Sequence, residues 1–135
     1  MQATRAGRVT AWALLALALA ANWAGYALDL YARFPWFDRV LHAGTILALT
    51  LWMAVLVFGR ALKGEPRHRV LTVILLTSLG IAAGALWEVA EWAFDRVAPG
   101  DVIKGKHDTI LDIVMDTAGA LSAALLARAL LRHPR

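Results

Sequence analysis

The sequence predicts an all-α integral membrane protein in which four transmembrane helices form one up-down bundle, with residues 1–135 as a single domain. Of the 135 residues, 60% are hydrophobic, a fraction that is too high for a typical soluble chain of this length. The apolar residues fall into four stretches of roughly 20 residues, and at ~1.5 Å per residue each stretch can cross the hydrocarbon core. The connections are short, so consecutive helices are expected to run antiparallel.

The predicted helices alternate with three connections that agree with this topology. Their approximate bounds are 9–28, 40–58, 70–93 and 110–131. Arg5 and Arg8 before an Ala/Leu run also resemble a secretory signal peptide, but the run is long enough to span the membrane. The connection 29–39 is rich in aromatic residues, which favour the headgroup level of the membrane. The connection 59–69 is predicted to be a basic turn, and the connection 95–109 contains the Gly and Pro residues that are typical of a loop.

The lysines and arginines indicate how the bundle is oriented. Nine of the 14 lie at the helix ends that share a side with the termini, and five lie at the opposite ends. Because Lys and Arg are enriched on the cytoplasmic side, both termini are expected to be cytoplasmic. This distribution explains the net charge of +4 without a nucleic-acid partner. The chain has no cysteine, which excludes disulfides and thiolate chemistry.

Nine of the ten acidic residues gather at the opposite, outer ends of the predicted helices. They are Asp29, Asp38, Glu88, Glu91, Asp95, Asp101, Asp108, Asp112 and Asp116. Acids contribute little to membrane orientation, and an ionised carboxylate inside the membrane is costly unless it is paired, metal-bound or hydrated. Their clustering therefore predicts a functional site at this end of the bundle.

Helical spacing directs these acids toward one another. Three pairs share a helix face at i,i+3 or i,i+4 spacing: Asp38 with His42, Glu88 with Glu91, and Asp112 with Asp116. Gly80 and Gly84 continue the Glu88 face, and Gly119 continues the Asp116 face. Since small residues mark close helix contacts in membranes, both faces are expected to point into the bundle. The pairs are expected to meet about 5–10 Å below the outer boundary.

This polar cluster has three interpretations. A divalent metal ion could be bound by carboxylates and an imidazole, namely Asp38, His42, Glu88, Asp112 and Asp116. Alternatively, the carboxylates could share protons, as in a proton or ion relay. In the third interpretation the acids only hold the helices together and are neutralised by basic partners, with Arg33, Arg39, Lys104 and Lys106 as the candidates.

Three ordered motifs resemble those of a known family. They are F-D-R-V-L-H-A-G at 37–44, W-E-V-A-E-W at 87–92 and H-D-T-I-L-D-I-V-M-D-T-A-G-A at 107–120. Together they resemble YjdF-type inner-membrane proteins and, more distantly, the VanZ-like group, which has asparagine where this chain has Asp116. The resemblance implies a multi-pass protein of the bacterial cytoplasmic (inner) membrane. It names no reaction, but it implies functional positions at Asp38, His42, Glu88, Glu91, Asp112, Asp116 and Gly119.

The leading functional hypothesis is a membrane protein of the cell envelope that binds, or as an enzyme hydrolyses, a lipid or lipid-linked group. In the enzymatic form a metal ion activates water, and Glu88 or Glu91 is the general base. The anionic group of the substrate is expected to bind at Lys104, Lys106 and His107. One alternative is a small proton- or cation-coupled transporter, which we expect to be a homo-oligomer. The other is a structural or partner-binding membrane subunit.

Overall fold

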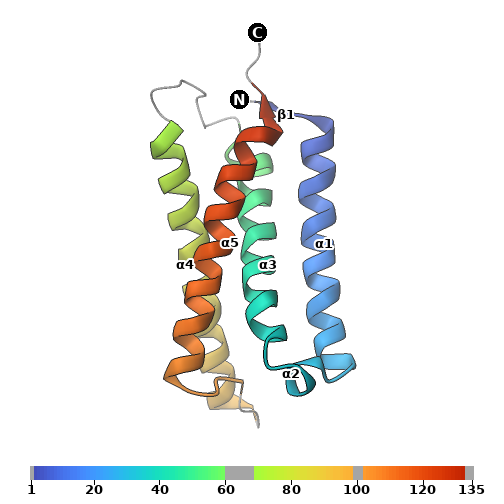
Figure 1. Cartoon of the computed structure of the whole chain (residues 1–135), viewed down its shortest axis with the longest axis vertical. Coiled ribbons are helices and arrows are strands. Elements are labelled where there is room, and N and C mark those ends of the chain that lie inside the picture. The colour runs from blue at the N-terminus through green and yellow to red at the C-terminus, as the bar shows by residue number, and fades with distance from the viewer. Residues whose placement is uncertain (1, 60–68, 99–101, 133–135) are drawn as a thin grey trace.

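The computed structural model describes residues 2–59, 69–98 and 102–132, which are helical apart from loops and one pair of very short strands (Figure 1). In chain order the elements are β1 (Gln2–Ala3), α1 (Arg5–Ala27), α2 (Leu30–Arg33), α3 (Phe37–Trp52), the π-helical turn η1 (Met53–Val57), α4 (Arg69–Val97), α5 (Lys106–Leu130) and β2 (Leu131–Arg132). Four helices, α1, α3 continued by η1, α4 and α5, are each long and apolar enough to cross a membrane. The predicted four-helix membrane fold is therefore confirmed.

The helices alternate in direction, and both ends of the described chain meet at one end of the bundle (Figure 1). There β1 pairs antiparallel with β2, with Gln2 opposite Arg132 and Ala3 opposite Leu131. The two terminal segments thus lie on the same side of the membrane, and the cytoplasmic assignment of that side stays a prediction. The expected basic turn at 59–69 falls almost entirely outside the described residues.

At the end of the bundle opposite the paired strands, called the outer end from here on, the helices extend beyond their apolar stretches. Helix α4 continues to Val97 and α5 begins at Lys106, so both ends of the expected loop 95–109 are helical. Gly105, with a φ of 121°, turns the chain into α5, and its carbonyl accepts a hydrogen bond from the Asp108 amide at 3.0 Å. Hydropathy marks only the part of a helix inside the hydrocarbon core, because polar residues can continue the helix among the headgroups.

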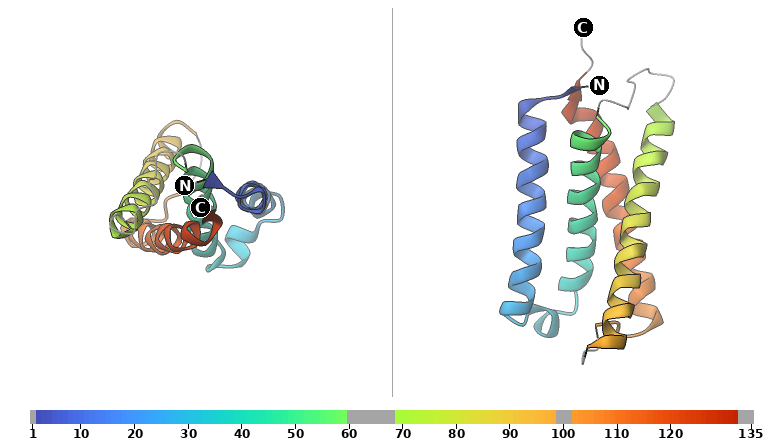
Figure 2. Two further views of the ribbon diagram at one scale, coloured as in Figure 1. Left: turned by 90° about the horizontal axis from the view of Figure 1, so that it is seen from above. Right: turned by 180° about the vertical axis from the view of Figure 1, so that it is seen from behind.

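Three helices form the tight part of the bundle. Helix α5 packs against α3 and against α4, whereas α1 packs mainly on α3 and makes little contact with α4. The view from above in Figure 2 shows α1 to one side of the other three helices. The predicted polar cluster lies within the group formed by α3, α4 and α5, and α1 forms a side wall next to it.

The inner half of the bundle, near the paired strands, is an apolar core. Its buried side chains are Ala11, Leu51, Ala54, Val55, Leu76, Ala123, Ala124 and Ala127. Most of them are small, so the helix backbones approach closely and pack by van der Waals contact. The turn η1, closed by a 2.9 Å hydrogen bond from the Phe58 amide to the Met53 carbonyl, supplies two of these residues.

Glycines bring α5 close to both of its neighbours, as the small-residue faces predict. A Cβ atom at Gly119 of α5 would collide with the backbone carbonyl of Ala43 in α3. A Cβ atom at Gly80 of α4 would collide with the side chains of Thr50 in α3 and Ala120 in α5, and a Cβ atom at Gly84 would collide with the Asp116 carboxylate of α5. The inward orientation predicted for these faces is confirmed.

Candidate functional site

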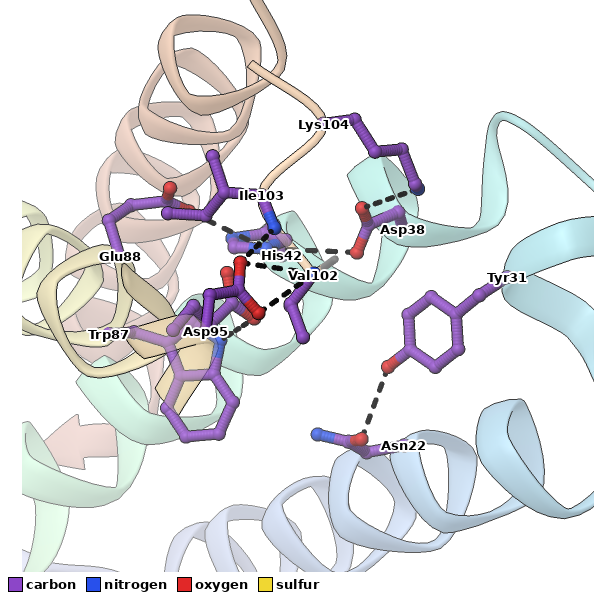
Figure 3. Close-up of polar contacts among 11 residues, drawn as sticks. Asn22, Tyr31, Asp38, His42, Trp87, Glu88, Asp95, Val102, Ile103 and Lys104 are labelled. Carbon is purple, nitrogen blue, oxygen red and sulfur yellow. Dashed lines mark hydrogen bonds and ion pairs between the residues drawn. The ribbon is translucent and has the colours of Figure 1, made fainter. Parts of the chain in front are cut away.

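His42 lies at the centre of the outer half of the bundle, among carboxylates from three helices. Its side chain is buried, as only 6% of the residue is exposed. Its Nδ1 atom lies 3.2 Å from Asp116 Oδ1, and its Nε2 atom lies 3.8 Å from both Asp38 Oδ1 and Glu88 Oε1. Figure 3 shows His42 between Asp38 and Glu88. The first turns of α3 supply Asp38 and His42, α4 supplies Glu88, and α5 supplies Asp116.

The structure brings the side chains predicted as metal ligands into one region and divides them into groups. One atom each from His42, Glu88 and Asp112 lie within 4.8 Å of one another, and all three residues are buried. Asp38, Asp108 and Asp112 form a second group with the same limit. Ligand atoms that bind a cation at about 2.0–2.6 Å are about 3–5 Å apart, so both groups have a spacing that a metal ion could bridge.

Three buried carboxylate oxygens of this cluster have no hydrogen-bond partner among the described residues. They are Glu88 Oε1, Asp112 Oδ1 and Asp116 Oδ2. The three residues are only 6%, 3% and 1% exposed, so bulk water solvates them little. A buried acceptor left unpaired costs about 1–3 kcal/mol, and an ionised one costs more. These oxygens therefore need a proton, a cation or ordered water.

The basic groups near the cluster do not balance its charge. The four carboxylates around His42 belong to Asp38, Glu88, Asp112 and Asp116. A protonated His42 and Lys104 would leave a charge of −4 + 2 = −2. Of the expected basic partners, Lys104 forms an ion pair with the cluster, whereas Arg33, Arg39 and Lys106 form none within the part of the chain that the structure describes. A network of salt bridges therefore accounts for only part of this charge.

The contact with Asp116 favours one tautomer and one orientation of the His42 imidazole ring. With its proton on Nδ1, the imidazole donates to Asp116 and leaves the lone pair of Nε2 facing Asp38 and Glu88. Metal-binding histidines commonly donate their second ring nitrogen to a carboxylate in this way, which fixes the tautomer and the ring orientation. Asp116, which the sequence grouped with the ligands, lies outside both metal-compatible groups and contacts the opposite ring nitrogen.

A cavity of about 220 Å³ lies next to the cluster, between α1, α3 and α4. Its outer end is polar, lined by Asn22, Tyr31, Asp38, His42, Glu91 and Asp116. Its inner walls are mainly apolar, with Thr45 as a polar exception, and are lined by Leu15, Leu19, Ile46, Leu49 and Ala83. The cavity therefore has a polar end toward the connections 29–36 and 98–105 and a mainly apolar end toward the middle of the bundle.

Aromatic residues and hydrogen bonds fix the walls of this cavity. The Tyr31 hydroxyl donates to Asn22 Oδ1 at 3.1 Å and so joins α2 to α1 (Figure 3). Burial raises the pKa of the Tyr31 hydroxyl above its usual range, so this group stays a donor. Across the cavity, Trp87 Nε1 donates to Glu91 Oε1 at 2.8 Å. Of the two predicted general bases, Glu91 lines the cavity and Glu88 belongs to a metal-compatible group.

The connection between α4 and α5 places Lys104 above Asp38. Asp95 in the last turn of α4 accepts hydrogen bonds from the amides of Val102, at 3.0 and 3.1 Å, and Ile103, at 2.9 Å. The next residue, Lys104, lies with Nζ 3.7 Å from Asp38 Oδ2, and its side chain is 52% exposed (Figure 3). The carboxylate of Asp95 thus anchors the segment that carries this ammonium group.

The other two residues predicted to bind an anionic group are placed differently. Lys106 and His107, expected in a loop, lie in the first turn of α5 and are exposed. Neither forms a hydrogen bond or ion pair with the cluster among residues 2–59, 69–98 and 102–132. They therefore flank the site at the headgroup level, and Lys104 is the basic residue that reaches it.

Sequence reasoning missed Asp108 as a member of the cluster. Asp108, Asp112 and Asp116 follow one another at i,i+4 spacing, which is the signal that could have identified it. The predicted start of the last helix at residue 110 hid this signal, because Asp108 was assigned to a loop. The anchoring role of Asp95 had no comparable signal, since it depends on where the chain returns after α4.

Comparison with known proteins agrees with the YjdF-type resemblance of the motifs. The family described as "Predicted membrane protein (DUF2238)" matches residues 5–133. A Thermotoga maritima protein named "Uncharacterized protein" is 30% identical over 102 residues, which cover 74% of this chain and 52% of that protein. The chain therefore spans about half the length of this relative. No solved structure matches the chain. The VanZ-like resemblance stays a prediction.

Proposed function

Since the chain belongs to the DUF2238 family of membrane proteins, we propose that it binds a divalent cation next to His42 and uses it to hold the anionic headgroup of a membrane lipid or lipid-linked group. The observation that carries this proposal is the cavity next to His42, which is polar at its outer end and apolar further in. With the termini in the cytoplasm, the site belongs to the outer leaflet of the bacterial cytoplasmic membrane.

The cation is proposed because of the unbalanced charge and the ligand types. His42 Nε2, Glu88 and Asp112 would be its ligands, and Asp116 would orient the imidazole. With Nε2 bound to the ion and Nδ1–H donating to Asp116, His42 would be neutral, so the four carboxylates and Lys104 would leave a charge of −3. A divalent ion would lower this charge to −1, and one protonated carboxyl would complete the balance. Nitrogen and carboxylate ligands suit Mn²⁺, Fe²⁺ or Zn²⁺.

The lipid is proposed because the cavity borders the membrane. Helix α1 packs on α3 and makes little contact with α4, and the cavity lies between these three helices. An acyl chain could enter between α1 and α4 without unfolding either helix. Leu15 and Leu19 on α1 and Ala83 on α4 would contact the chain, while its headgroup would reach the cation.

A hydrolytic reaction at this site would use the bound cation to activate water. Glu91 lines the cavity and would act as the general base, which leaves Glu88 as a ligand. Lys104 would contact the anionic group directly, and Lys106 and His107 would attract it at the headgroup level. The more distant VanZ-like resemblance concerns the same part of the chain and transfers no reaction to it.

Filling the cavity tests the proposal, and neighbouring alanines on α4 provide a matched pair. Ala83 lines the cavity, whereas Ala82 is exposed on the surface of the bundle. Purified protein is incubated with phosphatidylglycerol, and bound lipid is counted by native mass spectrometry in the presence of Mn²⁺ or EDTA. We expect Ala83→Phe to lose the lipid and Ala82→Phe to retain it. EDTA is expected to weaken binding to wild type by about tenfold or more, since a charge-assisted contact contributes about 1.5–3 kcal/mol.

Two results would refute the proposal in different ways. Equal lipid retention by Ala83→Phe and Ala82→Phe would place the lipid outside the cavity. Equal retention by wild type in Mn²⁺ and in EDTA would remove the cation from the mechanism. Phosphatidylcholine serves as the control lipid, because its headgroup carries no net charge to be held by the cation.

A further inference from the structure

A second group of carboxylates adjoins the proposed cation site. One oxygen each from Asp38, Asp108 and Asp112 lie within 4.8 Å of one another. Asp108 and Asp112 are one turn apart in α5, and Asp38 lies in the first turn of α3. These two helices have the most extensive contact in the bundle, so the fold itself brings the three side chains together.

Asp112 belongs to both groups and is the buried residue that connects them. It is only 3% exposed, and its Oδ1 atom has no hydrogen-bond partner among the described residues. Glu88, a member of the first group, also has a buried oxygen without such a partner, Oε1. A carboxylate has two oxygens and can bind a different cation through each of them. Because the two groups share Asp112, their ligands adjoin one another, and two cations bound there would be neighbours.

We propose that Asp38, Asp108 and Asp112 bind a second divalent cation, which Asp112 bridges to the first; this inference rests on the proposed function. All three ligands of the second position are carboxylates, which favour a hard cation such as Mg²⁺, Mn²⁺ or Ca²⁺. The first position differs by including an imidazole. Two ions that share a carboxylate bridge typically lie about 3.5–4 Å apart and can hold two oxygens of one anionic group.

Lys104 acts as a tethered competitor for the second cation. Its ammonium lies 3.7 Å from Asp38 Oδ2, so it neutralises this carboxylate when no cation is bound. The side chain is 52% exposed and can swing into solvent. Asp95 holds the backbone of Val102 and Ile103, which keeps the lysine within reach after it has moved. The second position is therefore expected to bind its cation more weakly than the first.

The experiment counts manganese ions in the intact protein. Wild type is stripped with EDTA, reconstituted in phosphatidylcholine nanodiscs, loaded with Mn²⁺ and measured by elemental analysis and electron paramagnetic resonance. We expect two Mn²⁺ per chain with spin coupling in wild type, and one uncoupled Mn²⁺ in Asp108→Asn. Asp29→Asn is the matched control, because Asp29 is an exposed outer acid that belongs to neither group. It is expected to retain two coupled ions.

The outcomes separate this inference from the proposed function. One Mn²⁺ per chain in wild type, unchanged by Asp108→Asn, would overturn the second position and leave the first. No Mn²⁺ in wild type would overturn both. The wild-type count and its spin coupling remain decisive even where Asp108→Asn does not fold. Lys104→Met is expected to raise the affinity for the second Mn²⁺ by up to about fivefold. A lower affinity in this variant would refute the competition.

Discussion

The inner and outer halves of the bundle pack in the same way, but the inner half buries apolar side chains and the outer half buries charged and polar ones. In both halves small residues let the helix backbones approach closely. In the inner half this closeness buries Leu51 and Leu76 among alanines. In the outer half it buries Asp116 against Gly84, next to His42. The same backbone arrangement therefore builds an apolar core at one end and a polar cluster at the other.

The two halves should differ in their contributions to the stability of the bundle and to ligand binding. Apolar contacts stabilise the bundle, whereas buried carboxylates without partners oppose folding unless something binds them. A chain under selection for stability alone would extend the alanine and leucine core to both ends. The polar outer half is thus better explained by a ligand. Mutations in the two halves are expected to separate stability from binding.

The largest expected effect is in the inner half. Leu76→Ala removes a fully buried side chain from the core and is expected to lower the free energy of unfolding by about 2–5 kcal/mol. Leu75→Ala is the control, because Leu75 is 45% exposed on the same helix. Denaturant unfolding in nanodiscs measures both variants. Bound Mn²⁺ per chain is expected to stay at the wild-type value in each. If folded Leu76→Ala lost its bound Mn²⁺, packing in the inner half would affect metal binding in the outer half, and the two functions would not be separable.

The next effect is in the outer half and concerns binding. Asp116→Asn retains an oxygen that can accept from His42 Nδ1, but it lacks the charge that holds the ring. Loss of such an orienting group lowers metal affinity by about 10–100-fold, so we expect about tenfold for Asp116→Asn and about 100-fold for Asp116→Ala. Mn²⁺ titration followed by calorimetry measures this. Equal affinities in both variants and wild type would mean that Asp116 does not orient a ligand.

The sequence was sufficient to predict the helices and most of the cluster, because both follow from local patterns. Apolar length identified the four spans, and i,i+4 spacing placed His42, Glu88 and Asp112 on inward faces. The glycine faces also predicted which sides of α4 and α5 would touch. These features need only the period of a helix and the solvent outside it.

Other features depend on contacts between distant segments and could not be predicted in this way. Asp108 joined the cluster because Gly105 starts α5 earlier than hydropathy indicates. The cavity exists because α1 packs mainly on α3 and little on α4, while the Tyr31 hydroxyl donates a hydrogen bond back to Asn22. The strand pair at the chain ends depends on the complete bundle. Each is decided by tertiary packing, which a single sequence pattern does not encode.

The smallest expected effect comes from two helical glycines, one exposed and one packed against a neighbouring helix. A Cβ at Gly84 would lie 2.6 Å from Asp116 Cγ, whereas a Cβ at Gly44 would have nothing within 4 Å. Gly44→Ala is expected to stabilise the protein by up to ~1 kcal/mol through helix propensity. In Gly84→Ala, overpacking of about 1–3 kcal/mol outweighs this gain, for a net loss of about 0–2 kcal/mol.

Mn²⁺ affinity is expected to distinguish Gly84→Ala from Gly44→Ala more clearly than stability does. In Gly84→Ala the added methyl displaces Asp116 from His42, so Mn²⁺ affinity is expected to fall together with stability. In Gly44→Ala the affinity is expected to stay at the wild-type value. Unfolding in nanodiscs and Mn²⁺ titration measure both quantities on the same samples. If Gly84→Ala lost stability and kept full affinity, the close packing of the outer half would serve the helices alone, because the position of Asp116 would then not matter for the cation.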